Sequence, residues 1–326
     1  MRPSPSLIFP LLFLGNVTLH ASEHGPSPEI KRVVFLGDSI TYSGQYIEFI
    51  ESYLKLCEPA VNREFLNLGL PSETLSGLTE PGHANGDFPR PDLHERLDRV
   101  LAETKPDLIV ACYGMNDGVY HPYDEKRFAK FREGILFLRD HAKTAGVKII
   151  HVTPPTFDPA PIKKNTLPLG LAEYRRPYEG YDDVLSRYSS WLVDRRKEGW
   201  DVIDIHTPMA AHLVNERRLD PNYRLADDGV HLNAVGHALI ARAILQYWGA
   251  SIEKLNEGET FEKLLATFPH GTKVFELVQQ KQRVLKDAYL TAVRHKRPGM
   301  ARGLTLADAQ KLAAECDVKI RDLIGR

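Results

Sequence analysis

The 326-residue chain has few cysteines and none in pairs. Cys57, Cys112 and Cys316 are its three cysteines, and none has C-x-x-C spacing. This odd, sparse set is not a disulfide framework, and a structural zinc site is not expected. Cys112 lies in an apolar run and is expected to be a small core residue. A single disulfide between Cys57 and another cysteine is compatible with the sequence.

Motifs that would hold a cofactor are also missing. The 13 histidines form no H-E-x-x-H or comparable cluster, and the glycines match neither a P-loop nor a dinucleotide fingerprint. We therefore expect no metal and no cofactor.

The chain has almost no net charge and no long apolar run. Lys and Arg number 42 against 43 Asp and Glu, which gives a formal net charge of −1. Because phosphate binding usually needs a basic face, this balance argues against a nucleic-acid partner. We expect no stable membrane span, and the length suits one large domain or a domain with an appendage. The oligomeric state is not indicated.

Residues 1–21 have the pattern of a signal peptide. Arg2 supplies the positive start, Leu7–Leu14 form a short apolar core, and Ala21 ends a cleavage-like site. The alternative is an anchoring or disordered N-terminus. We expect export to the periplasm or the outside of the cell.

Five short apolar runs alternate with helical stretches through the middle of the chain. Runs rich in Val, Ile and Leu are typical of strands buried on both faces. Their alternation with helices predicts an α/β fold, in which a parallel sheet is covered on both sides. The predicted strands are Arg32–Leu36, Glu64–Leu68, Asp107–Cys112, Val147–Val152 and Asp201–Ile205.

Two segments depart from this alternation. Residues 154–177 contain six prolines and several basic side chains, including Arg175, and are predicted to form a long loop. This loop could bind substrate, or it could be a solvent-exposed surface loop without a role in binding. Residues 252–326 show helical periodicity without a strand, interrupted at Pro298-Gly299. We predict a helical hairpin there, packed on the main domain or on a partner chain.

Three short motifs carry the chemistry. Gly37-Asp38-Ser39-Ile40 follows the first predicted strand, Gly114-Met115-Asn116-Asp117 follows the third, and Asp228-Gly229-Val230-His231 comes late in the chain. Sites in parallel sheets lie at the carboxyl ends of strands, which is where Ser39 and Asn116 are expected.

These residue types suit nucleophilic catalysis. The Ser39 hydroxyl needs a base within reach, and His231 is the predicted base. Asp228 would orient the imidazole and stabilise its cation. The Ser39 N–H and the Asn116 amide are predicted donors to an oxyanion. Each motif alone is weak, and Asn116 could instead be a helix cap, but their joint occurrence predicts a serine hydrolase.

The side chains next to these residues are predicted to have supporting roles. Asp38 and Asp117 are expected to hold the loops around Ser39 and Asn116. Tyr113 and Tyr120 are expected either to line an acyl or sugar pocket or to pack as core aromatics.

The three motifs resemble the first, third and fifth blocks of the SGNH hydrolases, also called the GDSL esterase/lipase family, over roughly residues 31–250. The resemblance implies a flavodoxin-like three-layer α/β/α fold without a metal, here over residues 22–251. It also implies Ser39 as nucleophile, His231 as base, Asp228 as its orienter and Asn116 as oxyanion donor.

The second block departs from the family pattern. Aligning Asn67, Gly69 and Thr74 places Ser72 where the family has a glycine that gives a backbone N–H to the oxyanion. Only the main-chain donor is required, so Ser72 can serve if the backbone angles permit. Gly69 is the alternative donor.

The expected function is hydrolysis of a short-acyl ester, with acetyl on a carbohydrate expected first, largely by family analogy. A lipid or thioester substrate is the alternative. An α/β-hydrolase is disfavoured because Thr41 stands where its G-x-S-x-G elbow needs glycine. The alternative from another functional class is a binding or assembly module that kept the fold. The helical tail, which could dock a partner, and the altered second block motivate this alternative.

Overall fold

The computed structural model describes residues 25–166, 168, 176–258 and 260–325. The predicted signal peptide, residues 1–21, lies outside these described residues. So does part of the predicted loop at 154–177, including Arg175.

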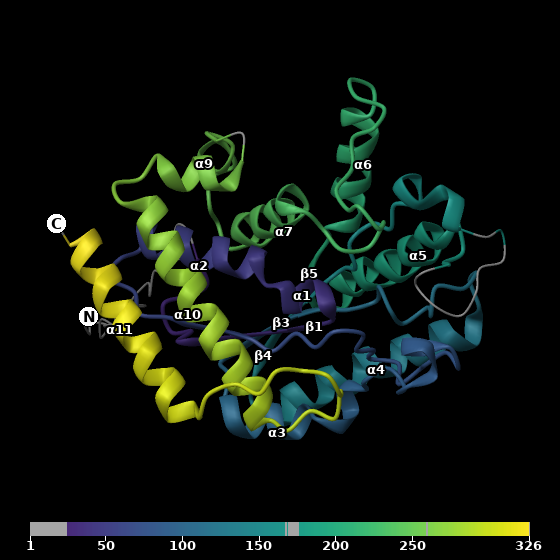
Figure 1. The fold of residues 1–326 in the computed structure, drawn as a ribbon, viewed down its shortest axis with the longest axis horizontal. Helices are drawn as coiled ribbons and strands as arrows, with labels where there is room; N and C mark the ends of the chain where they lie inside the picture. The colour runs from purple at the N-terminus through teal and green to yellow at the C-terminus, as the bar shows by residue number, and fades with distance from the viewer. Residues whose placement is uncertain (1–24, 167, 169–175, 259, 326) are drawn as a thin grey trace, which may run out of the picture.

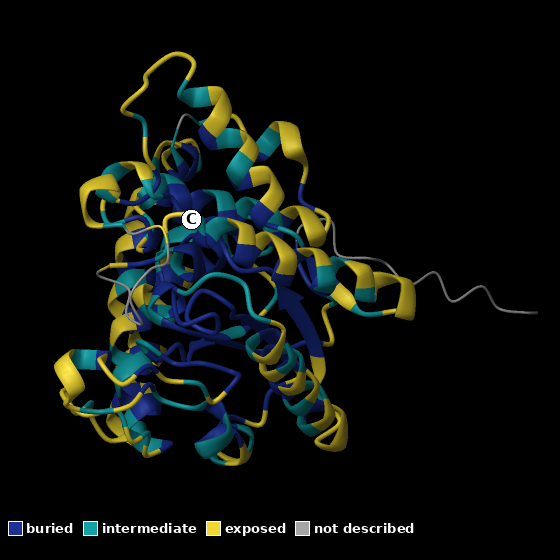
Figure 2. Ribbon diagram, turned by 90° about the vertical axis from the view of Figure 1, so that its right-hand side faces the viewer, coloured by how far each residue is buried: buried dark blue, intermediate teal, exposed yellow. Residues whose placement is uncertain are grey.

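A five-stranded parallel sheet forms the centre of the molecule (Figure 1). Its strand order is β2-β1-β3-β4-β5, the order of doubly wound flavodoxin-like folds. The strands are buried on both faces (Figure 2), which explains their continuous apolar sequences. The prediction of all five strands is confirmed to within two residues at each end. They are β1 (Arg32–Gly37), β2 (Glu64–Asn67), β3 (Leu108–Cys112), β4 (Lys148–Val152) and β5 (Asp201–Ile203).

Helices cover both faces of the sheet, which confirms the three-layer α/β/α fold (Figure 1). One face carries α2 (Gln45–Cys57) and α7 (Ala234–Tyr247). The other carries α3 (Leu97–Thr104), α4 (Glu125–Thr144) and α5 (Tyr181–Asp194). The apolar stripe of α4 packs on α5, where the Phe131 and Tyr188 rings stack with centroids 4.5 Å apart. Helix α6 (His206–Glu216) projects beyond this body (Figure 1).

The C-terminal part is helical, as predicted. The short helices α8 (Ile252–Leu255) and α9 (Phe261–Ala266) lead into two long antiparallel helices, α10 (Gly271–Ala292) and α11 (Leu306–Ile324). Thr305 caps α11, since its hydroxyl oxygen accepts from the Asp308 N–H at 3.2 Å. Helix α10 packs against α2 and β2, and Phe275 stacks on Phe49 with centroids 5.2 Å apart. The hairpin thus covers the edge of the fold where β2 lies.

All three cysteines are free thiols, so Cys57 forms no bridge. Within the described ranges, no group of His, Cys, Asp or Glu side chains is arranged to hold a metal ion. No helix in the described part of the chain combines the length and the apolar character that a membrane crossing requires.

Candidate active site

Ser39 lies at the carboxyl end of β1, where it begins the short helix α1 (Ser39–Ser43). The strand-to-helix turn is tight, because a Cβ on Gly37 would lie 2.1 Å from the Thr41 hydroxyl oxygen. As the first N–H of a helix, the Ser39 amide has no intrahelical acceptor. It can therefore donate to a substrate oxygen beside the Ser39 hydroxyl.

His231 lies between Ser39 and Asp228. Its Nε2 is 2.9 Å from Ser39 Oγ, and its Nδ1 is 2.6 Å from Asp228 Oδ2. The other Asp228 oxygen accepts from the backbone N–H groups of Val230 at 3.0 Å and His231 at 2.8 Å. One carboxylate therefore holds both the ring and the loop that carries it. Hydrogen bonds join the three residues that the sequence predicted to form a triad.

The charge pair perturbs both pKa values. Burial acts to raise the pKa of Asp228, but hydrogen bonds from the ring and backbone of His231 lower it to about 2. The hydrogen bond to Asp228 raises the pKa of His231 above its usual value, and burial opposes this rise. Neighbouring Asp227 pairs instead with Arg224 at 2.5 Å, which leaves Asp228 to orient the ring.

The Asn116 amide is oriented from both sides. Its Nδ2 donates to the Glu73 carbonyl oxygen at 3.1 Å, and its Oδ1 accepts from the Tyr120 hydroxyl at 3.0 Å. Because a backbone carbonyl can only accept, the NH₂ group must face Glu73. Its second N–H is left for another acceptor. Tyr120 is buried and supports Asn116 as well as packing in the core.

Asp38 and Asp117 hold the adjoining loops. The Asp38 carboxylate caps α1 by accepting from the Ile40 N–H at 2.9 Å. Asp117 accepts from the backbone N–H groups of Leu75 and Ser76, both at 2.8 Å, and so ties the turn after β3 to the loop after β2. Burial raises the pKa of Asp38 to about 7 and that of Asp117 to about 6, although the hydrogen bonds lower both values.

The loop after β2 contains a tight turn over residues 70–73, closed by a 3.1 Å hydrogen bond between its end residues. Ser72 has a φ of +69°, the left-handed backbone that glycine adopts without steric cost. Among the described residues, none accepts a hydrogen bond from the Ser72 N–H. The Gly69 N–H, by contrast, donates to Asn67 Oδ1 at 2.9 Å. Ser72, not Gly69, has the free backbone donor.

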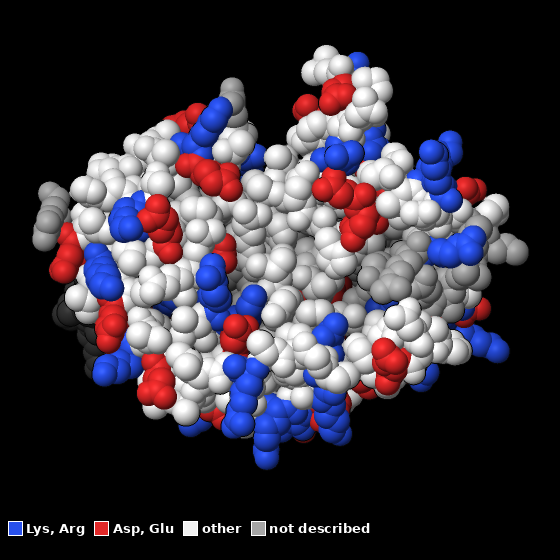
Figure 3. Space-filling model, viewed as in Figure 1, with Lys and Arg blue, Asp and Glu red and all other residues white. Residues whose placement is uncertain are grey.

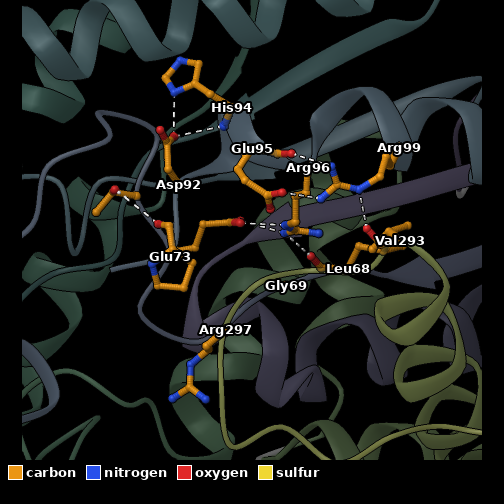
Figure 4. Close-up of polar contacts among 12 residues, drawn as sticks. Leu68, Gly69, Glu73, Asp92, His94, Glu95, Arg96, Arg99, Val293 and Arg297 are labelled. Atoms are coloured by element: carbon orange, nitrogen blue, oxygen red, sulfur yellow. Dashed lines mark hydrogen bonds and ion pairs between the residues drawn. The ribbon is translucent and has the colours of Figure 1, made fainter. Parts of the chain in front are cut away.

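A buried ion pair that no sequence motif indicated lies beneath this turn (Figure 4). Arg96 donates through Nε and Nη2 to the Glu73 carboxylate at 2.6 and 2.7 Å, and the Tyr113 hydroxyl donates to it at 2.6 Å. Removing one partner of a buried pair typically costs about 3–5 kcal/mol. Tyr113 is therefore a buried support of the turn. No sequence pattern relates Glu73 to Arg96, because only the fold brings them together.

A sequence model of the GDSL-like lipase/acylhydrolase family matches residues 35–239, well over half of the chain and including all three motifs. The chain belongs to this family. This confirms the resemblance seen in the motifs, and with it the classification as a carboxylic ester hydrolase. No curated protein sequence matches this chain.

Solved structures are similar to this GDSL hydrolase in fold, at low sequence identity. A gut microbial diltiazem-metabolizing enzyme has a TM-score of 0.51 and 21% identity over 70% of this chain, which spans only 49% of that protein. A catalytic mutant of an acetylxylan esterase from Geobacillus stearothermophilus has a TM-score of 0.49 and 18% identity, covering 68% and 95% of the two chains. The acetyl xylan esterase AlAXEase has a TM-score of 0.48 and 21% identity, covering 66% of this chain and 98% of that one.

Proposed function

We propose that this GDSL hydrolase cleaves esters through a covalent acyl-enzyme on Ser39. The observation that carries the proposal is the unbroken series of hydrogen bonds from Ser39 Oγ through the His231 ring to Asp228. A serine hydroxyl is a weak nucleophile until a base accepts its proton, and His231 Nε2 lies at the distance that transfer requires.

The reaction divides into two similar halves. Ser39 Oγ attacks the ester carbonyl carbon while His231 takes the hydroxyl proton, and Asp228 stabilises the imidazolium. The oxyanion would accept hydrogen bonds from the N–H groups of Ser39 and Ser72 and from Asn116 Nδ2. Collapse of the tetrahedral intermediate breaks the bond between the carbonyl carbon and the alcohol oxygen, and His231 gives the proton to the leaving alcohol. Water, deprotonated by His231, then cleaves the acyl-enzyme to release the acid and free Ser39.

The proposed substrate is a short-acyl ester, with acetyl on a carbohydrate as the first candidate. The His231 and Asp228 side chains are 47% and 43% exposed, so an acyl group on a bulky alcohol can reach them at the surface. Figure 3 shows that the middle of the face seen in Figure 1 is hollowed and mostly uncharged. Four cavities of 210–580 Å³ among the described residues are lined by no triad residue, and the smallest adjoins the turn that contains Ser72. A long acyl chain would need such a cavity at Ser39.

A p-nitrophenyl ester series from acetate to palmitate tests this assignment. We expect the highest kcat/KM for acetate, followed by acetate release from acetylated oligosaccharides. A preference for chains longer than about eight carbons would require a buried apolar channel and would move the assignment to a lipolytic esterase.

We also propose that the protein is exported, and the signal-peptide pattern of residues 1–21 supports this. The test is cell fractionation followed by measurement of the mass of the mature N-terminus.

The pH dependence of kcat/KM should show an acidic limb with a midpoint above 6.5, the ordinary pKa of histidine. Only neutral His231 can accept the Ser39 proton. Because Asp228 raises the pKa of His231, activity is full above that raised pKa and is lost as the pH falls through it. Rates with p-nitrophenyl acetate, which does not titrate in this range, measure the limb. A flat profile between about pH 5 and 8 would contradict the assignment of His231 as base.

Replacement of Asn116 by alanine should lower kcat by about 10²–10³-fold with a smaller change in KM. The amide would bind the oxyanion more tightly than the ground-state carbonyl, so its loss acts mainly on the chemical step. Tyr120→Phe is the matched control, because it removes the hydrogen bond to Asn116 Oδ1 and keeps the amide itself. Asn116→Ala activity within about threefold of wild type would remove Asn116 from the oxyanion site.

A further inference from the structure

We propose that Arg297, on the loop between α10 and α11, is a positioning residue that keeps the Ser72 N–H directed at the oxyanion. Its Nε donates to the Pro71 carbonyl oxygen at 2.9 Å, although the two residues are 226 positions apart. The inference rests on the proposed role of Ser72. It gives the C-terminal hairpin a part in the reaction that the sequence did not indicate.

A single peptide plane connects Arg297 to the oxyanion donor. The Pro71 carbonyl and the Ser72 N–H belong to the same planar peptide and point in opposite directions when it is trans. A donor that fixes the carbonyl therefore fixes the direction of the N–H. The guanidinium is also cationic, so it polarises the peptide and strengthens the N–H as a donor on the far side.

The sequence of the turn makes this support necessary. Proline at the second position suits both type I and type II turns, but type II requires a positive φ at the third position. Ser72 occupies that position with a φ of +69°. Flipping the Pro71–Ser72 peptide would give a type I turn, relieve Ser72 and direct its N–H away from the site. A glycine, which the family has here, adopts type II without steric cost, whereas Ser72 needs the contact with Arg297 to hold it.

The loop that carries Arg297 is anchored on the main domain (Figure 4). Arg99 of α3 donates through Nε to the Val293 carbonyl at 2.8 Å and through Nη2 to the Glu95 carboxylate at 2.7 Å. Lys296, the residue before Arg297, pairs with the same Glu95 carboxylate at 3.2 Å. Arg297 therefore reaches Pro71 from a loop that is held at Val293 by a backbone contact and at Lys296 by a side-chain ion pair.

Buried charges fix the helix that precedes this loop. Lys281 of α10 is 2% exposed and bonds Glu51 of α2 at 2.8 Å and Asp317 of α11 at 2.9 Å. One turn later, Lys286 donates to the Tyr42 carbonyl of α1 at 3.0 Å. The hairpin thus contacts both the helix that begins at Ser39 and the turn that contains Ser72.

The test is a double-mutant cycle between Arg297 and Ser72, measured with p-nitrophenyl acetate. Arg297→Ala should lower kcat about tenfold with little change in KM, since the unsupported turn spends most of its time as type I. Ser72→Gly keeps the backbone donor and adopts the positive φ without steric cost, so its kcat is the reference for the double variant. The double variant should regain the kcat of Ser72→Gly. A merely structural role for Arg297 would not be rescued by a change of backbone preference.

The control is Arg302→Ala, an exposed arginine on the same loop, which should match wild type in kcat and in melting temperature. Arg297→Ala at wild-type kcat, or a double variant as slow as Arg297→Ala, would overturn the inference and leave the triad standing. Full activity in Ser39→Ala would instead overturn the proposed function and, with it, the premise of this inference.

Discussion

Replacement of Ser39 by alanine is expected to lower kcat for p-nitrophenyl acetate by at least about 10⁴-fold, the scale seen when a triad serine is removed. The Ser39 oxygen would form the covalent bond to the acyl group, and alanine has no nucleophilic atom to replace it. Stability should barely change, because the side chain is partly exposed and alanine suits the start of α1. Steady-state rates and a thermal melt of the same preparation measure both effects.

Ser43 provides a matched control on the same helix. Its Oγ lies 2.9 Å from His237 Nε2, so it forms a second serine–histidine pair close to the first. This pair lacks a carboxylate, since the buried His237 Nδ1 has no hydrogen-bond partner in the described part of the chain. Burial, aided by the charge of His231, lowers the pKa of His237 to about 4. Ser43→Ala should therefore stay within a few fold of wild type, and the reverse pattern would assign the nucleophile to Ser43.

Replacement of Asp228 by asparagine should lower kcat by about 10⁴-fold while the fold is kept. The asparagine oxygen can still accept from the backbone N–H groups of Val230 and His231. Its NH₂ group would then face the ring and select the tautomer with a proton on Nε2. That nitrogen could no longer accept the proton of Ser39.

The same substitution should move the acidic limb of kcat/KM. The carboxylate raises the pKa of His231, so its loss should shift the limb to lower pH. Asp227→Asn is the control, because Asp227 is exposed and pairs with Arg224 away from the ring. An Asp228→Asn enzyme within about tenfold of wild type, with an unmoved limb, would show that Asp228 does not orient the base.

Local sequence patterns predicted most of the fold. The strands could be found because each is a short apolar run buried on both faces. Ser39, Asn116 and the Asp228–His231 pair could be found because each lies in a short motif near a strand end or on one loop. In each case the residues that carry the signal are neighbours in the chain.

The remaining part of the site depends on contacts between distant residues. Glu73 and Arg96 form a buried pair, and Arg297 reaches Pro71 across 226 residues, yet neither contact leaves a pattern of spacing. The backbone of Ser72 was also open from sequence, because serine seldom adopts a positive φ. The structure shows that it does, and the contact between Arg297 and Pro71 suggests why.

The most direct test of the central claim is covalent trapping of the nucleophile with a fluorophosphonate, followed by mass spectrometry of the digested protein. An activated serine displaces fluoride and keeps the phosphonyl group. We expect one adduct per chain on the peptide that contains Ser39, with much slower labelling of His231→Ala. An adduct on a different residue, or an active enzyme in which Ser39 stays unmodified, would contradict this expectation.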